Sequence, residues 1–186
     1  MEAVTALAAR TRLLLMDVDG VLTDGKLYNV PDATGKMVET KAFDSQDGIA
    51  LQWANWVGIK TGLISGRISP ATVERAAQCK IGYVFQGHIE KVPILEEILA
   101  DARLEPAEVA YVGDDLTDVV VMHRVGFAIA TANARPEVKR EAHYVTRAEG
   151  GRGAVREVIE LLLRAQGRWE EILRKYEISP SYQPGV

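Results

Sequence analysis

The sequence has little of the chemistry that disulfide-linked or histidine-based proteins use. It contains one cysteine, Cys79, in 186 residues. A single cysteine cannot form an internal disulfide, which fits a reducing compartment. The three histidines, His88, His123 and His143, are dispersed with no metal-binding spacing. We therefore treat them as structural or surface residues.

Long apolar runs and an excess of positive charge are also missing. No stretch approaches the ~20 apolar residues of a membrane-spanning helix, and Asp17 and Asp19 end the first apolar run. The first residues lack the basic flank and uninterrupted apolar stretch of a signal peptide. Lysine and arginine total 22 against 26 aspartate and glutamate residues, a net charge of −4. We expect a cytoplasmic protein with neither a membrane nor a nucleic acid as its partner.

What the chain does contain is an alternation of short apolar runs with segments of helical periodicity. The apolar runs predict buried strands at Leu13–Met16, Lys60–Ile64, Gly82–Phe85, Val109–Val112 and Phe127–Ala130. Between them, apolar residues three and four apart predict helices at Gly48–Val57, Ser69–Gln78, Val92–Ala102 and Leu116–Val125. This order is typical of an α/β fold, a Rossmann-like three-layer sandwich around a central parallel sheet. The length favours a single domain over 1–186.

One segment after the first strand interrupts the alternation. Lys26–Tyr28 and Met37–Phe43 resemble strands, and the turn-forming residues Pro31–Gly35 separate them. A β-hairpin insertion is therefore expected at about 26–43.

The C-terminal part, about 153–186, is expected to form helices and a tail. Gly150, Gly151 and Gly153 predict a flexible hinge, followed by a helix at Ala154–Ala165. Gly167 separates that helix from a shorter one. The last ten residues, with Pro180 and Pro184, are expected to be extended.

Two aspartates follow directly on the first apolar run. Side chains alternate sides in an extended segment, so Asp17 and Asp19 are expected to point the same way, with Val18 on the opposite side. Two carboxylates in one small space repel each other, and a divalent cation is the simplest compensation. A solvated Asp-Gly turn explains a lone pair of this spacing equally well.

A second acidic group, Gly113–Asp118, follows the apolar run Val109–Val112. Asp115 is placed to cap the next helix and Asp118 to interact with its dipole, and either residue can serve that purpose alone. Asp114 precedes the cap and is the better candidate for a metal ligand.

Two further groups complete the pattern. Ser65-Gly66-Arg67 follows an apolar run and precedes a helix, where a hydroxyl, backbone amides and a guanidinium can bind phosphate oxygens. Taken alone, these three residues are better explained as a plain turn, and Lys91 as a solvated lysine. Ligands of open parallel sheets bind at the carboxyl ends of strands, and three of the four groups follow expected strands. Together they indicate a Mg²⁺-assisted reaction on a phosphate ester.

In order along the chain, these groups resemble the four motifs of haloacid dehalogenase-like phosphatases. Within that superfamily the similarity is greatest to the family of 3-deoxy-D-manno-octulosonate (KDO) 8-phosphate phosphatases. The matching segments are Asp17–Gly25, Ser65–Arg67, Lys91, Gly113–Asp115 with Asp118, and Gly150–Glu157. The resemblance extends from about Leu13 to Gly167 and implies a hydrolase domain without a cap domain.

The resemblance assigns roles in catalysis. Asp17 is expected to be the nucleophile that forms an aspartyl-phosphate, and Asp19 to protonate the leaving alcohol and then activate water. Ser65 and Lys91 are expected to contact the phosphate.

It also implies a metal site. Mg²⁺ is expected to bind the Asp17 carboxylate, the Asp19 backbone carbonyl and Asp114. Asp118 is expected to support the metal shell, with Asp115 as the second acidic residue of that motif.

The substrate implied is KDO 8-phosphate, in lipopolysaccharide precursor synthesis. The substrate-binding residues would be Asp19, Asp47, Gly48, Gly66, Arg67, Arg75 and Lys91, with Arg67 and Arg75 as candidates to bind the sugar carboxylate or steer the phosphate. Near Asp47 and Gly48, where the resemblance leads us to expect arginine or lysine, the chain has Gln46 and Gln52.

Two alternatives stay open. The first is a phosphatase of a nine-carbon keto-sugar acid 9-phosphate, although Arg67 favours the octulosonate family. The second is a non-catalytic module for assembly or signalling, such as a receiver domain. Family members assemble as tetramers whose hairpins and C-terminal segments help to enclose the site, so a homotetramer is expected here.

Overall fold

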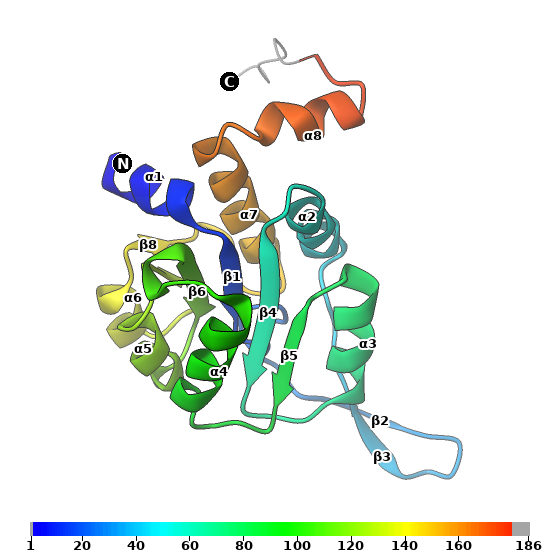
Figure 1. The fold of residues 1–186 in the computed structure, drawn as a ribbon. Helices are drawn as coiled ribbons and strands as arrows, with labels where there is room; N and C mark the ends of the chain where they lie inside the picture. Colours follow the sequence, from blue (N-terminus) through cyan, green and yellow to red (C-terminus); the bar gives the residue numbers. More distant parts are fainter. Residues whose placement is uncertain (1, 180–186) are drawn as a thin grey trace.

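The computed structural model describes residues 2–179 and is built on a six-stranded parallel sheet (Figure 1). The strand order is β5-β4-β1-β6-β7-β8. The strands are β1 (Leu13–Met16), β4 (Lys60–Ser65), β5 (Tyr83–Gln86), β6 (Val109–Gly113), β7 (Phe127–Ala130) and β8 (Tyr144–Val145). The expected α/β fold with a central parallel sheet is confirmed.

The order of the strands creates a point where the direction of winding reverses. From β1 the chain proceeds to β4 and β5 on one side, then returns to form β6, β7 and β8 on the other. Met16 pairs with both Leu63 and Val112, so the ends of the three strands lie close together. Open α/β sheets bind ligands at such a reversal, beyond the carboxyl ends of the strands.

Helices cover both faces of the sheet (Figure 1). One face carries α1 (Glu2–Arg10), α2 (Ser45–Trp56), α3 (Pro70–Cys79) and α7 (Ala154–Ala165), and α8 (Trp169–Lys175) lies beyond the end of the sheet and packs against α7. The other carries α4 (Val92–Ala102), α5 (Leu116–Met122) and α6 (Pro136–Glu141), with a 3-10 turn, η1, at Pro106–Glu108.

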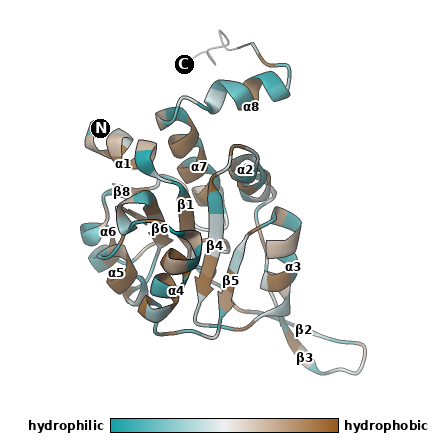
Figure 2. Ribbon diagram, viewed as in Figure 1, coloured by the Kyte–Doolittle hydropathy of each residue, from teal (hydrophilic) through white to brown (hydrophobic). Residues whose placement is uncertain are grey.

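The core explains why β1 is apolar at every position. Leu14 and Met16 belong to the core on one face of the sheet, and Leu13 and Leu15 to the core on the other. A parallel strand that helices cover on both sides has no solvent-facing positions. Figure 2 shows the same pattern as apolar colouring of the interior strands. The first residue that leaves this apolar environment is Asp17, at the end of the strand.

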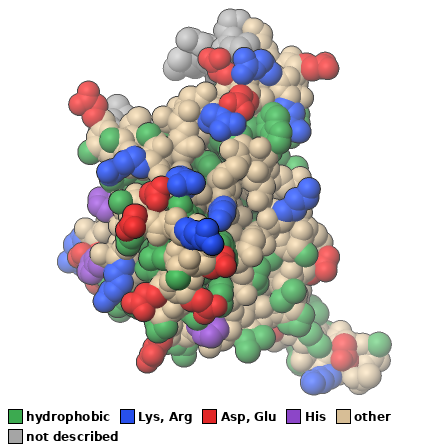
Figure 3. All heavy atoms as spheres, viewed as in Figure 1, with side chains coloured by type: hydrophobic (Ala, Val, Ile, Leu, Met, Phe, Trp, Pro, Cys, Tyr) green, Lys and Arg blue, Asp and Glu red, His purple; other side chains and the backbone are tan. Residues whose placement is uncertain are grey.

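The hairpin lies outside the sheet, as expected, but its boundaries differ from the prediction. Strands β2 (Tyr28–Pro31) and β3 (Met37–Thr40) pair antiparallel, instead of 26–28 with 37–43. The Asp32 side chain accepts hydrogen bonds from the backbone of Thr34 (2.8 Å) and Lys36 (3.1 Å), which places the turn after Pro31. The hairpin stands out from the body of the molecule (Figure 3). Within residues 2–179 no other strands lie outside the central sheet, and no cap domain is present.

The glycine-rich segment before α7 is not the flexible hinge that its composition predicted. A Cβ on Gly150 would lie 1.8 Å from the carbonyl oxygen of Gly20. The Gly150 N–H donates to Asn133 Oδ1 (2.6 Å), and the Gly151 N–H donates to the Val21 carbonyl (3.0 Å). Gly150 and Gly151 therefore allow two backbone segments to pack closely against each other, whereas a Cβ on Gly153 would meet open space.

The sequence analysis did not predict four short elements: α1, η1, α6 and β8. They have nine, three, six and two residues, too few for a clear periodic pattern. Helix α2 also begins earlier than predicted, because Asp44 caps it by accepting from the backbone N–H of Gln46 and Asp47.

At the C-terminal end, Gly167 (φ +67°) separates α7 from α8, as expected. The Trp53 ring meets Trp169 edge to face at 5.8 Å, and its indole N–H donates to the Tyr176 hydroxyl (3.0 Å). Of the expected extended tail, residues 180–186, including Pro180 and Pro184, lie outside the described residues. Among the described helices, none has both the length and the apolar character needed to cross a membrane.

Candidate active site

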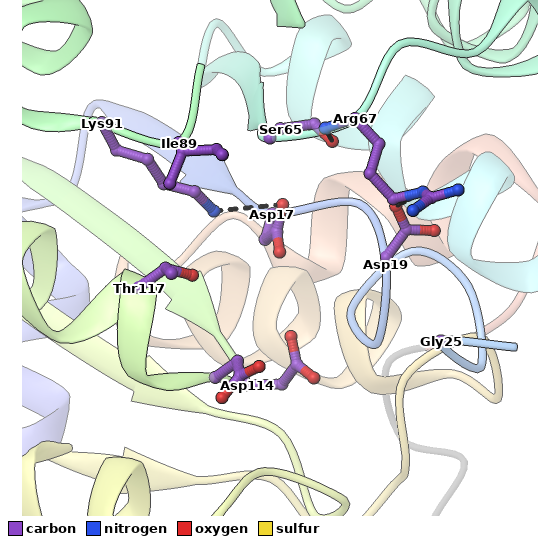
Figure 4. Close-up of a pocket in the computed structure, with 11 residues that line it drawn as sticks. Asp17, Asp19, Gly25, Ser65, Arg67, Ile89, Lys91, Asp114 and Thr117 are labelled. Carbon is purple, nitrogen blue, oxygen red and sulfur yellow. Dashed lines mark hydrogen bonds and ion pairs between the residues drawn. The ribbon is translucent and has the colours of Figure 1, made fainter. Parts of the chain in front are cut away.

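A cavity of about 320 Å³ opens at the carboxyl edge of the sheet (Figure 4). Asp17 follows β1, Ser65 ends β4 and Asp114 follows β6, so three strands deliver side chains to it. The cavity is lined by Asp17, Asp19, Gly25, Ser65, Gly66, Arg67, Ile89, Lys91, Asp114, Asp115 and Thr117. The four groups that the sequence singled out therefore converge.

Asp17 lies deep in this cavity and is only 9% exposed. Its backbone N–H donates to the Val112 carbonyl (3.0 Å), and Lys91 Nζ lies 3.1 Å from its Oδ1. Burial and the nearby charge of Asp118 raise the pKa of Asp17 to about 6, against the lowering effect of Lys91. A pKa of about 6 leaves this carboxyl group mostly ionised at neutral pH, the state in which a carboxylate can attack an electrophile.

Three carboxylates lie together beside β1 and β6. Asp17, Asp114 and Asp118 each offer one ligand oxygen, and these oxygens lie within 4.8 Å of one another. Burial, followed by the charges of Asp118 and Asp17, raises the pKa of Asp114 to about 8. Gly20 leaves room for Asp114, because a Cβ there would lie 2.0 Å from Asp114 Oδ2.

This carboxylate cluster fits a divalent cation. Within the described residues, Oδ1 of Asp114 is buried and accepts no hydrogen bond, and the buried Oδ1 of Asp17 has only the Lys91 ammonium beside it, at 3.1 Å. Mg²⁺ binds through one or two carboxylates and would satisfy both oxygens while offsetting their repulsion. Asp17 and Asp114 are thus suited to hold the metal.

Asp118 has a different task, because both of its oxygens are already hydrogen bonded. Oδ1 accepts from Lys91 Nζ (2.7 Å) and from the Tyr111 hydroxyl (2.7 Å). Oδ2 accepts from the backbone N–H of Asp114 (2.9 Å) and Asp115 (3.1 Å). Asp118 therefore orients both Lys91 and the loop that carries Asp114.

Lys91 remains a cation in this buried position. Burial by itself lowers the pKa of Lys91, but the charges of Asp118 and Asp17 outweigh it and raise the pKa overall. The side chain is 2% exposed, and its ammonium also lies 3.1 Å from the Tyr111 hydroxyl. A fixed positive charge beside Asp17 is suited to holding the oxygens of a phosphate.

The loop after β4 faces Asp17 from another side (Figure 4). The buried Ser65 hydroxyl accepts from the backbone N–H of Arg67 (3.2 Å), and the Ser65 carbonyl accepts from the His88 N–H (3.0 Å). The second bond joins this loop to the one that leads to Lys91. The Ser65 hydroxyl, the backbone amides of the loop and the Lys91 ammonium thus lie around the same part of the cavity, next to Asp17.

Comparisons with known proteins agree with this chemistry. A model of the haloacid dehalogenase-like hydrolases matches residues 54–159. The 3-deoxy-D-manno-octulosonate 8-phosphate phosphatase of Escherichia coli K12 is 43% identical over 168 residues, 90% of this chain and 87% of that protein. The chain belongs to the KDO 8-phosphate phosphatase family.

Solved structures of KDO 8-phosphate phosphatases have the same fold. The enzyme from Yersinia pestis, 42% identical, superposes with a TM-score of 0.86 over 91% of this chain and 89% of that one. The enzyme from Moraxella catarrhalis, solved in complex with magnesium, phosphate and KDO, is 35% identical. It superposes with a TM-score of 0.89 over 95% of this chain and 99% of that one.

Three residues expected to bind substrate in a KDO 8-phosphate phosphatase, Asp47, Gly48 and Arg75, do not line the cavity. Asp47 is buried, and its Oδ1 accepts from the Arg156 N–H (2.7 Å) in the first turn of α7. Burial raises the pKa of Asp47 to about 6. It therefore caps a helix instead of facing the cavity.

Arg75 and Gly48 pack against each other at the same junction of α2 with its neighbours. Arg75 Nη2 donates to the Asp44 carbonyl (2.6 Å), and a Cβ on Gly48 would lie 2.2 Å from that nitrogen. Gly48 is thus needed for close packing. Asp115 lines the cavity and also caps α5, the structural role that the sequence allowed for it.

Sequence reasoning missed Glu39, Lys41 and Tyr111. Lys41, just past β3, contacts Oδ1 of Asp19, and its side chain is only 2% exposed. Glu39 lies 3.6 Å from Lys41 and also contacts Arg67. The spacing of Glu39 and Lys41 at the end of β3 was the available signal, since residues two apart in a strand lie on the same face and can reach the same neighbours.

Proposed function

We propose that this protein is a Mg²⁺-dependent phosphatase that hydrolyses KDO 8-phosphate to the free sugar acid and phosphate through an aspartyl-phosphate. The observation that carries the proposal is the position of the Asp17 carboxyl group, held beside Lys91 and opposite Asp114 in one cavity. Two family members support the substrate, one by its name and 43% identity and the other by its bound KDO.

In the first step, an oxygen of Asp17 attacks phosphorus, and the bond between phosphorus and the ester oxygen breaks. Asp19 donates a proton to that oxygen, so the sugar acid leaves as an alcohol. Lys91, the Ser65 hydroxyl and backbone amides of the Ser65–Arg67 loop hold the phosphate oxygens during the transfer.

In the second step, Asp19 accepts a proton from a water molecule whose oxygen attacks phosphorus. The bond between phosphorus and Asp17 breaks, which releases phosphate and restores both carboxyl groups to their starting states. Asp118 keeps Lys91 and Asp114 in position throughout.

Mg²⁺ would be held by the carboxylates of Asp17 and Asp114 and by the backbone carbonyl of Asp19. When bound, it supplies positive charge that offsets the repulsion between the phosphate and the carboxylates.

The test is phosphate release from KDO 8-phosphate, with Mg²⁺ and with a chelator. The 9-phosphate of a nine-carbon keto-sugar acid and a generic aryl phosphate serve as comparison substrates. We expect Mg²⁺-dependent release that is fastest with KDO 8-phosphate. Faster turnover of the nine-carbon ester would reassign the substrate, and no release from any ester would favour a non-catalytic module.

We further propose a cytoplasmic homotetramer that acts in lipopolysaccharide precursor synthesis. The hairpin supports assembly, because Leu27 and Met37 expose more than half of their surface to solvent and Val30 nearly half. Covering these side chains with neighbouring subunits would bury apolar area and restrict access to the nearby cavity. Light scattering after size-exclusion chromatography measures the assembly. A fully active monomer would refute this part of the proposal.

A further inference from the structure

Four charged side chains alternate in sign at the outer side of the cavity. Lys41 contacts Asp19 Oδ1 and lies 3.6 Å from Glu39 Oε1. Arg67 contacts Glu39 Oε2, and its Nε lies 3.9 Å from Asp19 Oδ2. These two acidic and two basic side chains form a closed ring, which we call the charge ring. It joins the end of the hairpin to the loops after β1 and β4.

The members of the charge ring differ in how firmly they are held. The Lys41 side chain is 2% exposed, so its contact with Asp19 is shielded from water. The Arg67 side chain is 47% exposed, and its contact with Glu39 is open to solvent. Exposed ion pairs contribute little and exchange easily with other partners. The Glu39–Arg67 contact is therefore the one that a ligand can open.

The cavity places cationic groups on two sides of Asp17. Figure 4 shows Lys91 on one side and the Arg67 guanidinium beyond Asp19 on the other. Lys91 is buried beside Asp17, where the phosphate must lie, whereas Arg67 is at the outer edge. A phosphorylated sugar acid carries a second anion, its carboxylate, which a planar guanidinium binds well.

We propose that Glu39 is an internal competitor for the carboxylate of the sugar acid. In the free protein Glu39 pairs with Arg67, and the ligand carboxylate replaces it on binding. When the product leaves, Glu39 returns to Arg67, so the free sugar acid is held less tightly than it would be by an unpaired arginine. The inference rests on the proposed function, because it takes the ligand to be a sugar acid.

The test is inhibition by the free sugar acid, KDO, and by inorganic phosphate, both measured with an aryl phosphate as substrate. We expect Glu39→Gln to lower the inhibition constant of KDO two- to fivefold relative to that of phosphate, about the range of an exposed ion pair. In the Arg67→Gln background, Glu39→Gln should leave the inhibition constant of KDO unchanged, because the competed group is gone.

Glu108→Gln is the matched control, because Glu108 pairs with the exposed Arg12 (3.0 Å) and does not line the cavity. It should leave both inhibition constants unaltered. The inference is overturned if Glu39→Gln leaves or weakens KDO inhibition, strengthens inhibition by both anions equally, or acts equally without Arg67. Failure of the proposed function is separate, since it would show as no phosphate release from KDO 8-phosphate by the unaltered protein.

Discussion

The ammonium group of Lys91 lies 2.7 Å from Oδ1 of Asp118, in a place where neither side chain is more than 2% exposed. Asp118 also accepts from the Tyr111 hydroxyl and from two backbone N–H groups. One fully bonded carboxylate thus fixes the cation that faces Asp17 and the loop that carries Asp114. Its loss should affect both folding and catalysis.

Asp118→Asn should lower the free energy of unfolding by about 3 kcal/mol, because it leaves a buried ammonium with one carboxylate partner fewer. Phosphate release should also fall steeply, since Lys91 would no longer be held beside Asp17. Denaturant unfolding and steady-state assays measure the two effects. Glu108→Gln, which breaks an exposed ion pair, should cost less than about 1 kcal/mol. An equally small cost for Asp118→Asn would contradict the role given to it.

Tyr111→Phe removes two hydrogen bonds from the same network, one to Asp118 and one from Lys91, and leaves the ring in place. The free energy of unfolding should fall by about 2 kcal/mol, since the usual net value of one such bond is about 1 kcal/mol. We expect kcat to fall more than KM rises, because the hydroxyl orients Lys91 both directly and through Asp118 without lining the cavity. A kcat equal to that of the unaltered protein would show that the hydroxyl serves stability alone.

Mg²⁺ affinity should rise with pH. In the metal-free protein the pKa is raised to about 6 for Asp17 and to about 8 for Asp114, and the cation requires both carboxyl groups deprotonated. Apparent affinity should therefore increase from pH 6 to pH 8 and level off above. Calorimetric titration at several pH values, with proton release followed in two buffers, measures this. Affinity independent of pH would contradict the carboxylate cluster as the binding site.

The same raised pKa values set the stability of the metal-free protein. Protonated Asp17 and protonated Asp114 each contribute to the free energy of unfolding. Each contribution is fully present below pH 3.8, the pKa of an aspartate in the unfolded chain, and is lost as pH rises through the raised pKa of the folded protein. Mg²⁺ should therefore raise the melting temperature more at pH 8 than at pH 6. The opposite order would be inconsistent with proton displacement by the metal.

Asp47→Ala should destabilise the fold by about 1 kcal/mol, because the first turn of α7 loses its side-chain acceptor. Asp47→Asn keeps an oxygen acceptor. It should also escape the loss of stability that the unaltered protein suffers as pH rises through about 6, the raised pKa of Asp47. Thermal unfolding between pH 5 and pH 7 compares the two. Loss of phosphatase activity in a well-folded Asp47→Asn protein would contradict this structural role and indicate that Asp47 contributes to substrate binding.

The sequence was informative where a chemical group directly follows a buried strand. Asp17, Ser65 and Asp114 all lie at or just beyond the carboxyl ends of apolar runs, and a parallel sheet brings such ends together. An apolar run followed by an acidic or hydroxyl side chain therefore predicted both the strand and the site residue at its end. The resemblance to a known family then supplied roles that spacing alone left open.

The remaining residues depend on contacts between distant parts of the chain. Tyr111 lies within a strand of apolar residues and looks like any core residue until its hydroxyl meets Asp118. Asp47 resembles a site residue beside Gly48, yet its acceptor is used by the backbone of Arg156, 109 residues later. Lys41 and Glu39 contact Asp19 and Arg67, which line the cavity, only because the hairpin returns to the body of the protein.

The most direct test of the central claim is phosphate release from KDO 8-phosphate by Asp17→Asn in the presence of Mg²⁺. The variant removes a buried carboxylate whose pKa burial already raises, and Lys91 keeps its ion pair with Asp118 (2.7 Å), so the protein should still fold. It should nevertheless release no phosphate, because the amide cannot form the aspartyl-phosphate. A folded Asp17→Asn protein with full turnover would contradict the mechanism.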